Sequence, residues 1–196
     1  MEKDKNYTTH DLIKADMWRY HGRYSMTLLL KTFITSRTFR PVLTLRLCQA
    51  ANTLSPFLKI ITLPPLVILH RWFQNGGGMD IPWKCNIGPG FRITHGWGLV
   101  VHDDVVIGSN VTVFHGVTIG SKRKGDLLVA PIIGNDVVLS AGSIIIGEVN
   151  VGNGAIVGAG AIVVKDVAAS SVVVSDSSKE ILTGIEPRVS YPFPIN

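Results

Sequence analysis

Histidine is the residue type in this chain best suited to chemistry at neutral pH, because an imidazole can transfer a proton or bind a metal there. The chain has six histidines, and three of them, His95, His102 and His115, lie in its middle part. His95 stands in the segment Thr94-His95-Gly96-Trp97-Gly98, which interrupts a regular repeat. A residue in such an interruption can project where a regular repeat residue would be buried, so we predict that His95 lines a pocket.

The other two histidines carry weaker signals. His102 precedes Asp103 and Asp104, a pattern that favours a solvated corner. His115 has two interpretations, a surface residue at a subunit seam or a member of the site. Zinc is another use of imidazole, but the spacings between these histidines match no short zinc-ligand motif. We therefore expect no metal.

The repeat that must position these histidines has a period of six. Aliphatic residues recur at this interval: Ile87, Ile93, Val101, Ile107, Val113, Ile119, Ile133, Leu139, Ile145, Val151, Val157 and Val163. This period fits neither a helix nor an ordinary strand, and it is typical of a parallel β-helix in which three hexads close one triangular coil. Twelve inward positions predict about four coils, roughly 19 Å in height.

Two departures from the period divide the chain further. The step from Ile93 to Val101 is eight residues, and the step from Ile119 to Ile133 is fourteen. The longer gap predicts a loop at 120–132 extruded from one corner, because solenoids accept insertions there. We expect a β-helix domain over 78–175, a helical N-terminal region over 1–77 and a C-terminal tail, 176–196, that carries no motif.

The N-terminal region has helical periodicity. Thr8 or Thr9 could cap a first helix that ends near Gly22. Further helical segments are expected at Leu28 to Ile34, Val42 to Cys48 and Phe57 to Phe73. The last segment is shorter than the ~20 residues of a membrane span and is interrupted by Pro64 and Pro65, so we interpret it as a buried or interfacial pair of helices.

Charge is distributed unevenly between the two regions. Residues 1–77 hold eleven Lys or Arg against four Asp or Glu, and residues 78–196 hold eight against ten. The basic region could pack within a trimer or contact an anionic membrane surface. With two cysteines, Cys48 and Cys85, and a polar start to the chain, we expect a reduced, cytoplasmic protein, with peripheral contact at the inner membrane face as the alternative.

Aliphatic residues also occupy hexad positions that we expect to face outward: Val137, Val138, Ile144, Val149, Ile156 and Ile162. So much exposed aliphatic surface is rare on a soluble monomer, and closed self-association would cover it. We predict a homotrimer or a multiple of one, without nucleic acid as a partner.

The segment from Asp80 to Lys179 resembles the hexapeptide-repeat acyltransferases, and within them the serine acetyltransferase branch. The resemblance rests on Asp80-Ile81, Ile87-Gly88, His95-Gly96, His115-Gly116-Val117-Thr118-Ile119-Gly120, Ile133-Gly134 and Val157-Gly158-Ala159-Gly160. It implies a mainly β fold, a left-handed parallel β-helix preceded by helices. It further implies a trimer that binds acetyl-CoA in a groove between neighbouring prisms.

The same resemblance assigns catalytic roles. His95 corresponds to the general base and Asp80 to the carboxylate that orients it. An alcohol is too weakly acidic to attack a thioester unaided, and an imidazole with a pKa near 6.5 can accept its proton. The oxygen then attacks the acetyl carbonyl directly, so no acetyl-cysteine is needed and Cys85 is expected to be structural.

For CoA, the resemblance indicates a set of small or basic residues: Thr118, Gly120, Ser121, Ala141, Gly142, Ala159, Gly160, Lys165 and Lys179. Short side chains would let a pantetheine arm lie along the coils. The two lysines could bind phosphates or could simply lie at a solvated edge.

Departures from the serine acetyltransferase pattern bear on the acceptor. Thr94, Val129 and Ala130 stand where that pattern has the charged groups that hold an amino acid. The chain is similar in these features to enzymes that O-acetylate sugars of surface polysaccharides such as colanic acid. Candidate acceptor-binding residues are Thr94, Trp97, Asp103 and His115. Trp97 could stack on a sugar ring or could pack at a seam.

We therefore expect acetyl transfer to a sugar hydroxyl, with serine O-acetylation as the alternative. A non-catalytic β-helix scaffold is the alternative of another class.

Overall fold

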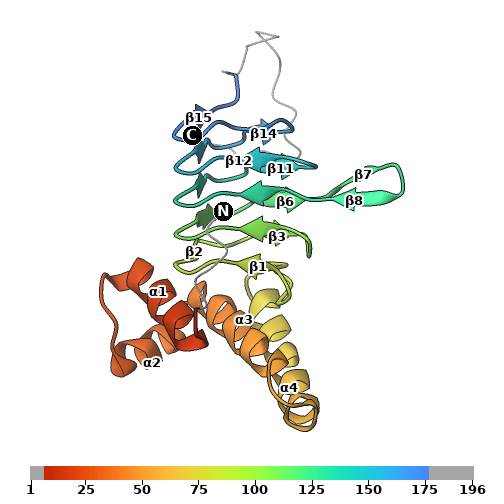
Figure 1. The fold of residues 1–196 in the computed structure, drawn as a ribbon. Coiled ribbons are helices and arrows are strands. Elements are labelled where there is room, and N and C mark those ends of the chain that lie inside the picture. Colours follow the sequence, from red (N-terminus) through yellow and green to blue (C-terminus); the bar gives the residue numbers. More distant parts are fainter. Residues whose placement is uncertain (1–6, 177–196) are drawn as a thin grey trace, which may run out of the picture.

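The structure is a computed structural model, and it describes residues 7–176. Four helices form one end of the molecule and a three-sided prism of short strands forms the other, as Figure 1 shows. The helices are α1 (Thr9–His21), α2 (Met26–Thr35), α3 (Phe39–Asn52) and α4 (Pro56–Asn75). None of the helices among the described residues has the length and apolarity to cross a membrane.

The first helix begins and ends where the sequence predicts. The Thr8 side chain accepts a hydrogen bond from the Asp11 backbone N–H, and the Asp11 side chain accepts one from the Thr8 backbone N–H. This reciprocal pair satisfies donors that a helix N-terminus otherwise leaves free. Gly22 closes the helix in the left-handed conformation, at φ 65°.

The prediction of two separate helices between Phe57 and Phe73 is wrong. Residues 56–75 form one helix, α4, with Pro64 and Pro65 inside it. Each proline removes one N–H that would bond to a carbonyl four residues earlier, at Ile60 and Ile61. Both of those residues are exposed, so water can satisfy the freed carbonyls and the helix continues.

The prism has three parallel sheets, one for each face. The β4 face has the order β1 (Asn86–Ile87), β4 (Val106–Ile107), β9 (Ile132–Ile133), β12 (Asn150–Val151). The β5 face has the order β15 (Val172–Val173), β13 (Ile156–Val157), β10 (Val138–Leu139), β5 (Thr112–Phe114), β2 (Arg92–Thr94). The β6 face has the order β14 (Ile162–Val163), β11 (Ile144–Ile146), β6 (Thr118–Gly120), β3 (Val100–Val101). The chain visits the β5, β6 and β4 faces in turn, which makes it a parallel β-helix and confirms the predicted class.

All twelve aliphatic residues of the six-residue period are buried in one continuous core. The expectation that Val137 and Val149 face outward is wrong, because their exposed fractions are 0% and 2%. Each stands two residues before a period residue, and alternate residues of a strand point to the same side. Every hexad therefore contributes two inward residues. Ile156 and Ile162 are exposed as predicted, whereas Val138 and Ile144 are half-buried.

The segment at 120–132 projects from one corner of the prism, as predicted, but it is a structured hairpin and not an irregular loop. Strands β7 (Lys122–Lys124) and β8 (Leu127–Val129) pair antiparallel, with Lys122 opposite Val129. Figure 1 shows this hairpin projecting sideways from the prism, after β6. It leaves the corner between the β6 and β4 faces, which we call the hairpin corner.

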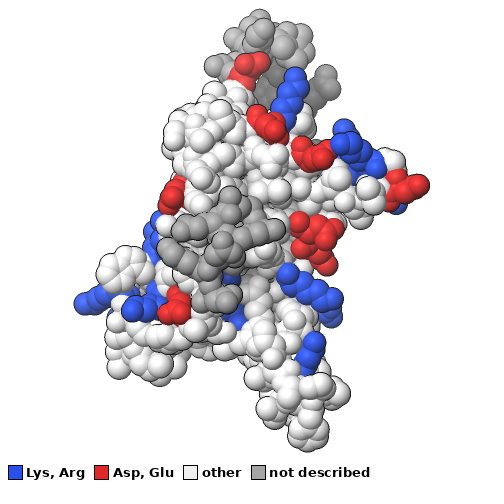
Figure 2. All heavy atoms as spheres, in the orientation of Figure 1, with Lys and Arg blue, Asp and Glu red and all other residues white. Residues whose placement is uncertain are grey.

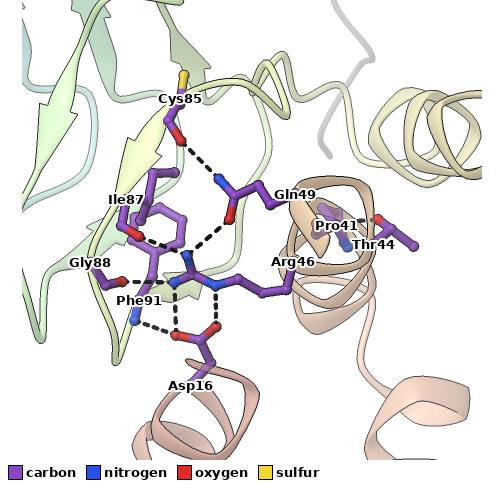
Figure 3. A network of polar contacts seen from close by, with 9 residues as sticks. All are labelled: Asp16, Pro41, Thr44, Arg46, Gln49, Cys85, Ile87, Gly88 and Phe91. Atoms are coloured by element: carbon purple, nitrogen blue, oxygen red, sulfur yellow. Dashed lines mark hydrogen bonds and ion pairs between the residues drawn. The ribbon is translucent and has the colours of Figure 1, made fainter. Parts of the chain in front are cut away.

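A buried ion pair joins the helices to the first coil, as Figure 3 shows. Arg46 of α3 donates to the Asp16 carboxylate of α1, with Nε 2.9 Å from Oδ2. The same guanidinium donates to the carbonyls of Ile87 and Gly88, each at 2.7 Å. Asp16 also accepts the Phe91 backbone N–H. The position of the helices relative to the coils is therefore fixed by directional bonds as well as by packing.

Candidate active site

His95 lies in a two-residue bulge at the corner between the β5 and β6 faces, which we call the His95 corner. Strands β2 and β5 pair with Thr94 opposite Phe114, and the Gly116 N–H then donates to the Trp97 carbonyl. Trp97 therefore takes the place that His115 has one coil later, and His95 and Gly96 are the extra residues. The eight-residue step in the sequence is this insertion.

The bulge holds His95 in a strained backbone conformation. Its φ is 66°, in the left-handed region that favours glycine and costs other residues about 1–2 kcal/mol. The following Gly96 also has a positive φ, 71°. As a result the His95 side chain points out of the prism and is exposed. Backbone strain of this kind is typical of functional sites, where the surrounding structure enforces it.

His115 is the aromatic neighbour of His95. The two imidazole rings lie 5.8 Å apart between centroids, at an interplanar angle of 73°. Both residues are exposed at the same corner. The structure thus brings together the two histidines whose shared role the sequence left open.

Asp80 lies on the β6 face, one coil before Val100. Its backbone pairs with Val100 in a parallel bridge, and the strand register places Val100 beside Thr118. Asp80 is exposed at the foot of this outward column. The structure contains no hydrogen bond or ion pair between the Asp80 carboxylate and the His95 ring, so the orienting contact implied by the resemblance is absent from this state of the chain.

Small residues form a continuous column above the histidines. Gly142 donates its N–H to the His115 carbonyl, and Gly160 donates its N–H to the Ala141 carbonyl. A Cβ on Gly116 would lie 3.4 Å from the Cα of Gly142. His95 and His115 therefore stand at the foot of a corner without bulky side chains, where Ala141, Gly142, Ala159 and Gly160 follow in register. A thin ligand could lie along it.

The other predicted CoA residues lie on the neighbouring face or at its far edge. Thr118 and Gly120 belong to β6 on that face, and Ser121 begins the hairpin. Lys165 is exposed beyond β14, and Lys179 lies outside the described residues.

A pocket of about 590 Å³ opens between the hairpin and the coils. Its basic side chains are Lys122, Arg123 and Lys124, of which Lys124 is paired with Glu148. Figure 2 shows basic and acidic side chains together on the projecting hairpin. These three residues lie in the segment 120–132, to which the sequence analysis assigned no function. Their place beside the β6 face makes them candidates for binding phosphates.

The predicted acceptor residues separate into two groups. Thr94 and Trp97 flank the bulge, and the indole of Trp97 is half exposed, at 50%. Asp103 lies at the hairpin corner, between His102 and Asp104, whose N–H donates to His102 Nδ1, and so it is not part of the His95 corner.

Sequence reasoning missed one functional candidate, Arg37, which precedes α3. Its guanidinium carbon lies 4.3 Å from the centroid of the Trp97 ring, and Nη2 donates to the His95 carbonyl at 3.4 Å. No local pattern could have shown this contact, because the two residues are 58 positions apart.

Neither cysteine is set up for covalent chemistry. Burial raises the pKa of Cys85 to about 12 and that of Cys48 to about 11. Both side chains are therefore neutral thiols at physiological pH, and the thiolate is the reactive form. The part of the chain that the structure describes also holds no group of three or more His, Cys, Asp or Glu arranged to bind a metal.

Comparison with known proteins relates this geometry to a family. No protein-family profile matches the chain. It is 39% identical over 147 residues to serine acetyltransferase 1 of Arabidopsis thaliana, a match that covers 72% of this chain and 45% of the plant protein. It is 39% identical over 116 residues to WcaB of Escherichia coli K12, an acetyltransferase whose name assigns it provisionally to colanic acid biosynthesis. That match covers 59% of this chain and 71% of WcaB.

Solved structures agree with the fold. A soybean serine acetyltransferase in complex with serine superposes with a TM-score of 0.69 at 27% identity, over 87% of this chain and 68% of the soybean chain. The prism is accordingly a left-handed parallel β-helix. The chain belongs to the hexapeptide-repeat acetyltransferase family that contains the serine acetyltransferases and WcaB.

Proposed function

We propose that this protein transfers the acetyl group of acetyl-CoA to a hydroxyl, with His95 as the general base. The observation that carries the proposal is the two-residue bulge, which directs an imidazole out of the coil at the foot of a column of glycine and alanine. A scaffold has no need of a strained, exposed histidine at this point. The family named above supplies the reaction class.

The chemistry needs one base and one polarised carbonyl. A neutral His95 ring accepts the proton of the acceptor hydroxyl while the oxygen attacks the thioester carbon. The tetrahedral intermediate then breaks its C–S bond, and the imidazolium returns the proton to the leaving thiolate. The products are the acetyl ester and free CoA.

Asp80 is the proposed orienting carboxylate. Catalytic hydrogen bonds are often long or poorly aligned in unliganded proteins and tighten when substrate binds. The exposed Asp80 side chain has the freedom to make such a contact from the adjoining face. His115, whose ring lies beside His95, is in place to contact either the base or the acceptor.

The donor is proposed to lie along the small-residue column, with its phosphates toward the basic side chains at the hairpin. A neighbouring prism would supply the second wall of this groove. The exposed aliphatic residues on the outside of the coils, such as Ile156, Ile162 and Val172, support a homotrimer, because closed association would bury them. We also propose a cytoplasmic location, which fits the use of acetyl-CoA. Peripheral contact with the inner membrane face is the alternative.

We favour a sugar of a surface polysaccharide as the acceptor. Thr94, Val129 and Ala130 are uncharged, so the positions that would hold the charged ends of serine lack their partners. The half-exposed Trp97 offers an aromatic face beside the base. The match covers 71% of WcaB but only 45% of the plant serine acetyltransferase, and the name of WcaB refers to a polysaccharide. Serine remains the second candidate because the other relatives are named for it.

Release of free CoA from acetyl-CoA tests the proposal, measured with serine and with surface oligosaccharides as acceptors. We expect turnover with an oligosaccharide and a loss of about 10²-fold or more in kcat for His95→Asn. Asparagine tolerates the left-handed conformation, so this variant should keep the fold. Turnover with serine alone would overturn the sugar assignment. Full activity of His95→Asn would overturn the mechanism.

A further inference from the structure

A second pocket, of about 340 Å³, lies next to the His95 corner and is built by the helices. It is lined by Arg37, Arg40, Trp72, Phe73, Asn75 and Gly76. This volume lies within the range of small-molecule sites, which combine aromatic walls with a few polar groups. Arg37 connects this pocket to the His95 corner, because it lines the pocket and also contacts His95 and Trp97.

The pocket has the aromatic surfaces that recognise sugar rings. Trp72 has an exposed fraction of 67%, and its ring lies 5.0 Å from that of Phe73. Phe73 is fixed in turn by an edge contact with Phe33 at 5.4 Å. An apolar ring face that stays exposed beside a polar group is suited to stacking on the flat, apolar side of a pyranose.

The pocket is also cationic. None of its lining residues is acidic, and no carboxylate among residues 7–176 lies within ion-pair distance of Arg37 or Arg40. Arg40 uses two donors on the carbonyls of Phe33 and Ile34, at the end of α2. Arg37 is exposed, and within the described part of the chain its single hydrogen bond goes to the His95 carbonyl, which leaves most of its five N–H donors without a partner there.

We propose that this pocket binds an oxyanion on the acceptor sugar, either the carboxylate of a uronic acid or a sugar phosphate, with Arg37 as its principal contact. The inference rests on the proposed function and specifies its substrate class. A guanidinium matches the geometry of both anions. Its contact with the His95 carbonyl places the bound anion next to the His95 corner, with Trp72 as the stacking surface for the sugar. Arg37 thereby acts in specificity and not in proton transfer.

Acetylation of matched acceptors tests this assignment. The first acceptor is a hexuronic acid oligosaccharide, the second is the same oligosaccharide with its carboxyl groups reduced to alcohols, and the third is a sugar phosphate. Each is assayed with the full chain, with Arg37→Gln and with Arg37→Lys. Arg23→Gln is the matched control, because Arg23 is a cation of the same helical region that lines a separate pocket.

We expect kcat/KM for one anionic acceptor to exceed that for the neutral one. Arg37→Gln should lower this anionic-to-neutral ratio about tenfold, the effect of losing one hydrogen bond to a charged group. Arg37→Lys should retain part of the ratio, and Arg23→Gln should leave it unchanged. The phosphate and carboxylate arms identify which anion is preferred.

The outcomes separate this inference from the proposed function. Equal use of neutral and anionic sugars, unaffected by Arg37→Gln, would overturn the anion site while acetyl transfer stands. Failure with every acceptor would instead count against the proposed function. Titration of His95→Asn with the hexuronic acid oligosaccharide and the sugar phosphate, followed by ligand NMR, then tests the pocket without chemistry. The site would be supported if one of these two ligands binds to His95→Asn and no longer binds when Arg37→Gln is added to that variant. Absence of binding by both ligands would refute the site.

Discussion

The left-handed backbone of His95 makes a prediction about stability that is independent of the reaction. His95→Gly and His95→Ala both remove the imidazole and its contact with His115. They differ only in the Cβ, which is strained at φ 66°. We therefore expect His95→Gly to be more stable than His95→Ala, whereas glycine is normally the less stable of the two.

The size of the difference follows from the backbone. A Cβ in the left-handed region costs about 1–2 kcal/mol, and the greater flexibility of glycine when unfolded offsets about 0.5–1 kcal/mol of that. The net expectation is that the glycine variant is more stable by about 1 kcal/mol. For a chain of this length, this corresponds to a melting temperature higher by about 2–4 °C.

Position 115 provides the control, because His115 is also exposed but has no positive φ. There the order should reverse, with His115→Ala more stable than His115→Gly by about 0.5–1 kcal/mol. Thermal melting of the four variants at one protein concentration measures both differences. If alanine is at least as stable as glycine at position 95, the strained bulge is not present in solution and the reasoning about the site fails.

Two further predictions concern the junction between helices and coils. Arg46→Ala leaves Asp16 buried without its cation and should lower the free energy of unfolding by about 3–5 kcal/mol. Urea denaturation measures this loss. A loss below about 1 kcal/mol would show that the ion pair does not hold the junction. His70 is buried against Thr44 and the Ile81 carbonyl, and burial lowers its pKa, so the folded state favours the neutral ring. The contribution of His70 to the free energy of unfolding should therefore be fully present above about pH 6.5, and the protein should lose up to about 1.4 kcal/mol of that free energy per pH unit as the pH falls below this value. Urea denaturation at several pH values measures the loss. A His70→Gln variant with the same acid sensitivity would refute this assignment.

Much of the coil architecture could be predicted from the sequence because the six-residue period is local and repeated. The buried period residues and the bulge before Val101 both follow from spacing alone. The second inward residue of each hexad was missed at Val137 and Val149, since the period was counted without the alternation of side chains within each strand. The hairpin at 122–129 was predicted only as an insertion, because its charged and aliphatic residues show no clear strand pattern.

The helical region was harder to predict for a different reason. Two adjacent prolines usually end a helix, but α4 continues through Pro64 and Pro65 at a place where Ile60 and Ile61 are exposed to solvent. Exposure depends on what packs against a helix, and that information is not local. The contact of Arg37 with the site is likewise a consequence of how the helices dock on the first coil.

The sequence by itself determined that the chain winds into stacked three-sided coils, because each hexad carries its own inward residues and its own corner. It also located His95 in the one short irregular step of that repeat. Only the tertiary structure decided which side chains surround it. Stacking of coils brought His115 and the glycine column to the same corner, and docking of the helices brought Arg37. Such contacts depend on the summed packing of distant segments, which no single stretch of residues specifies.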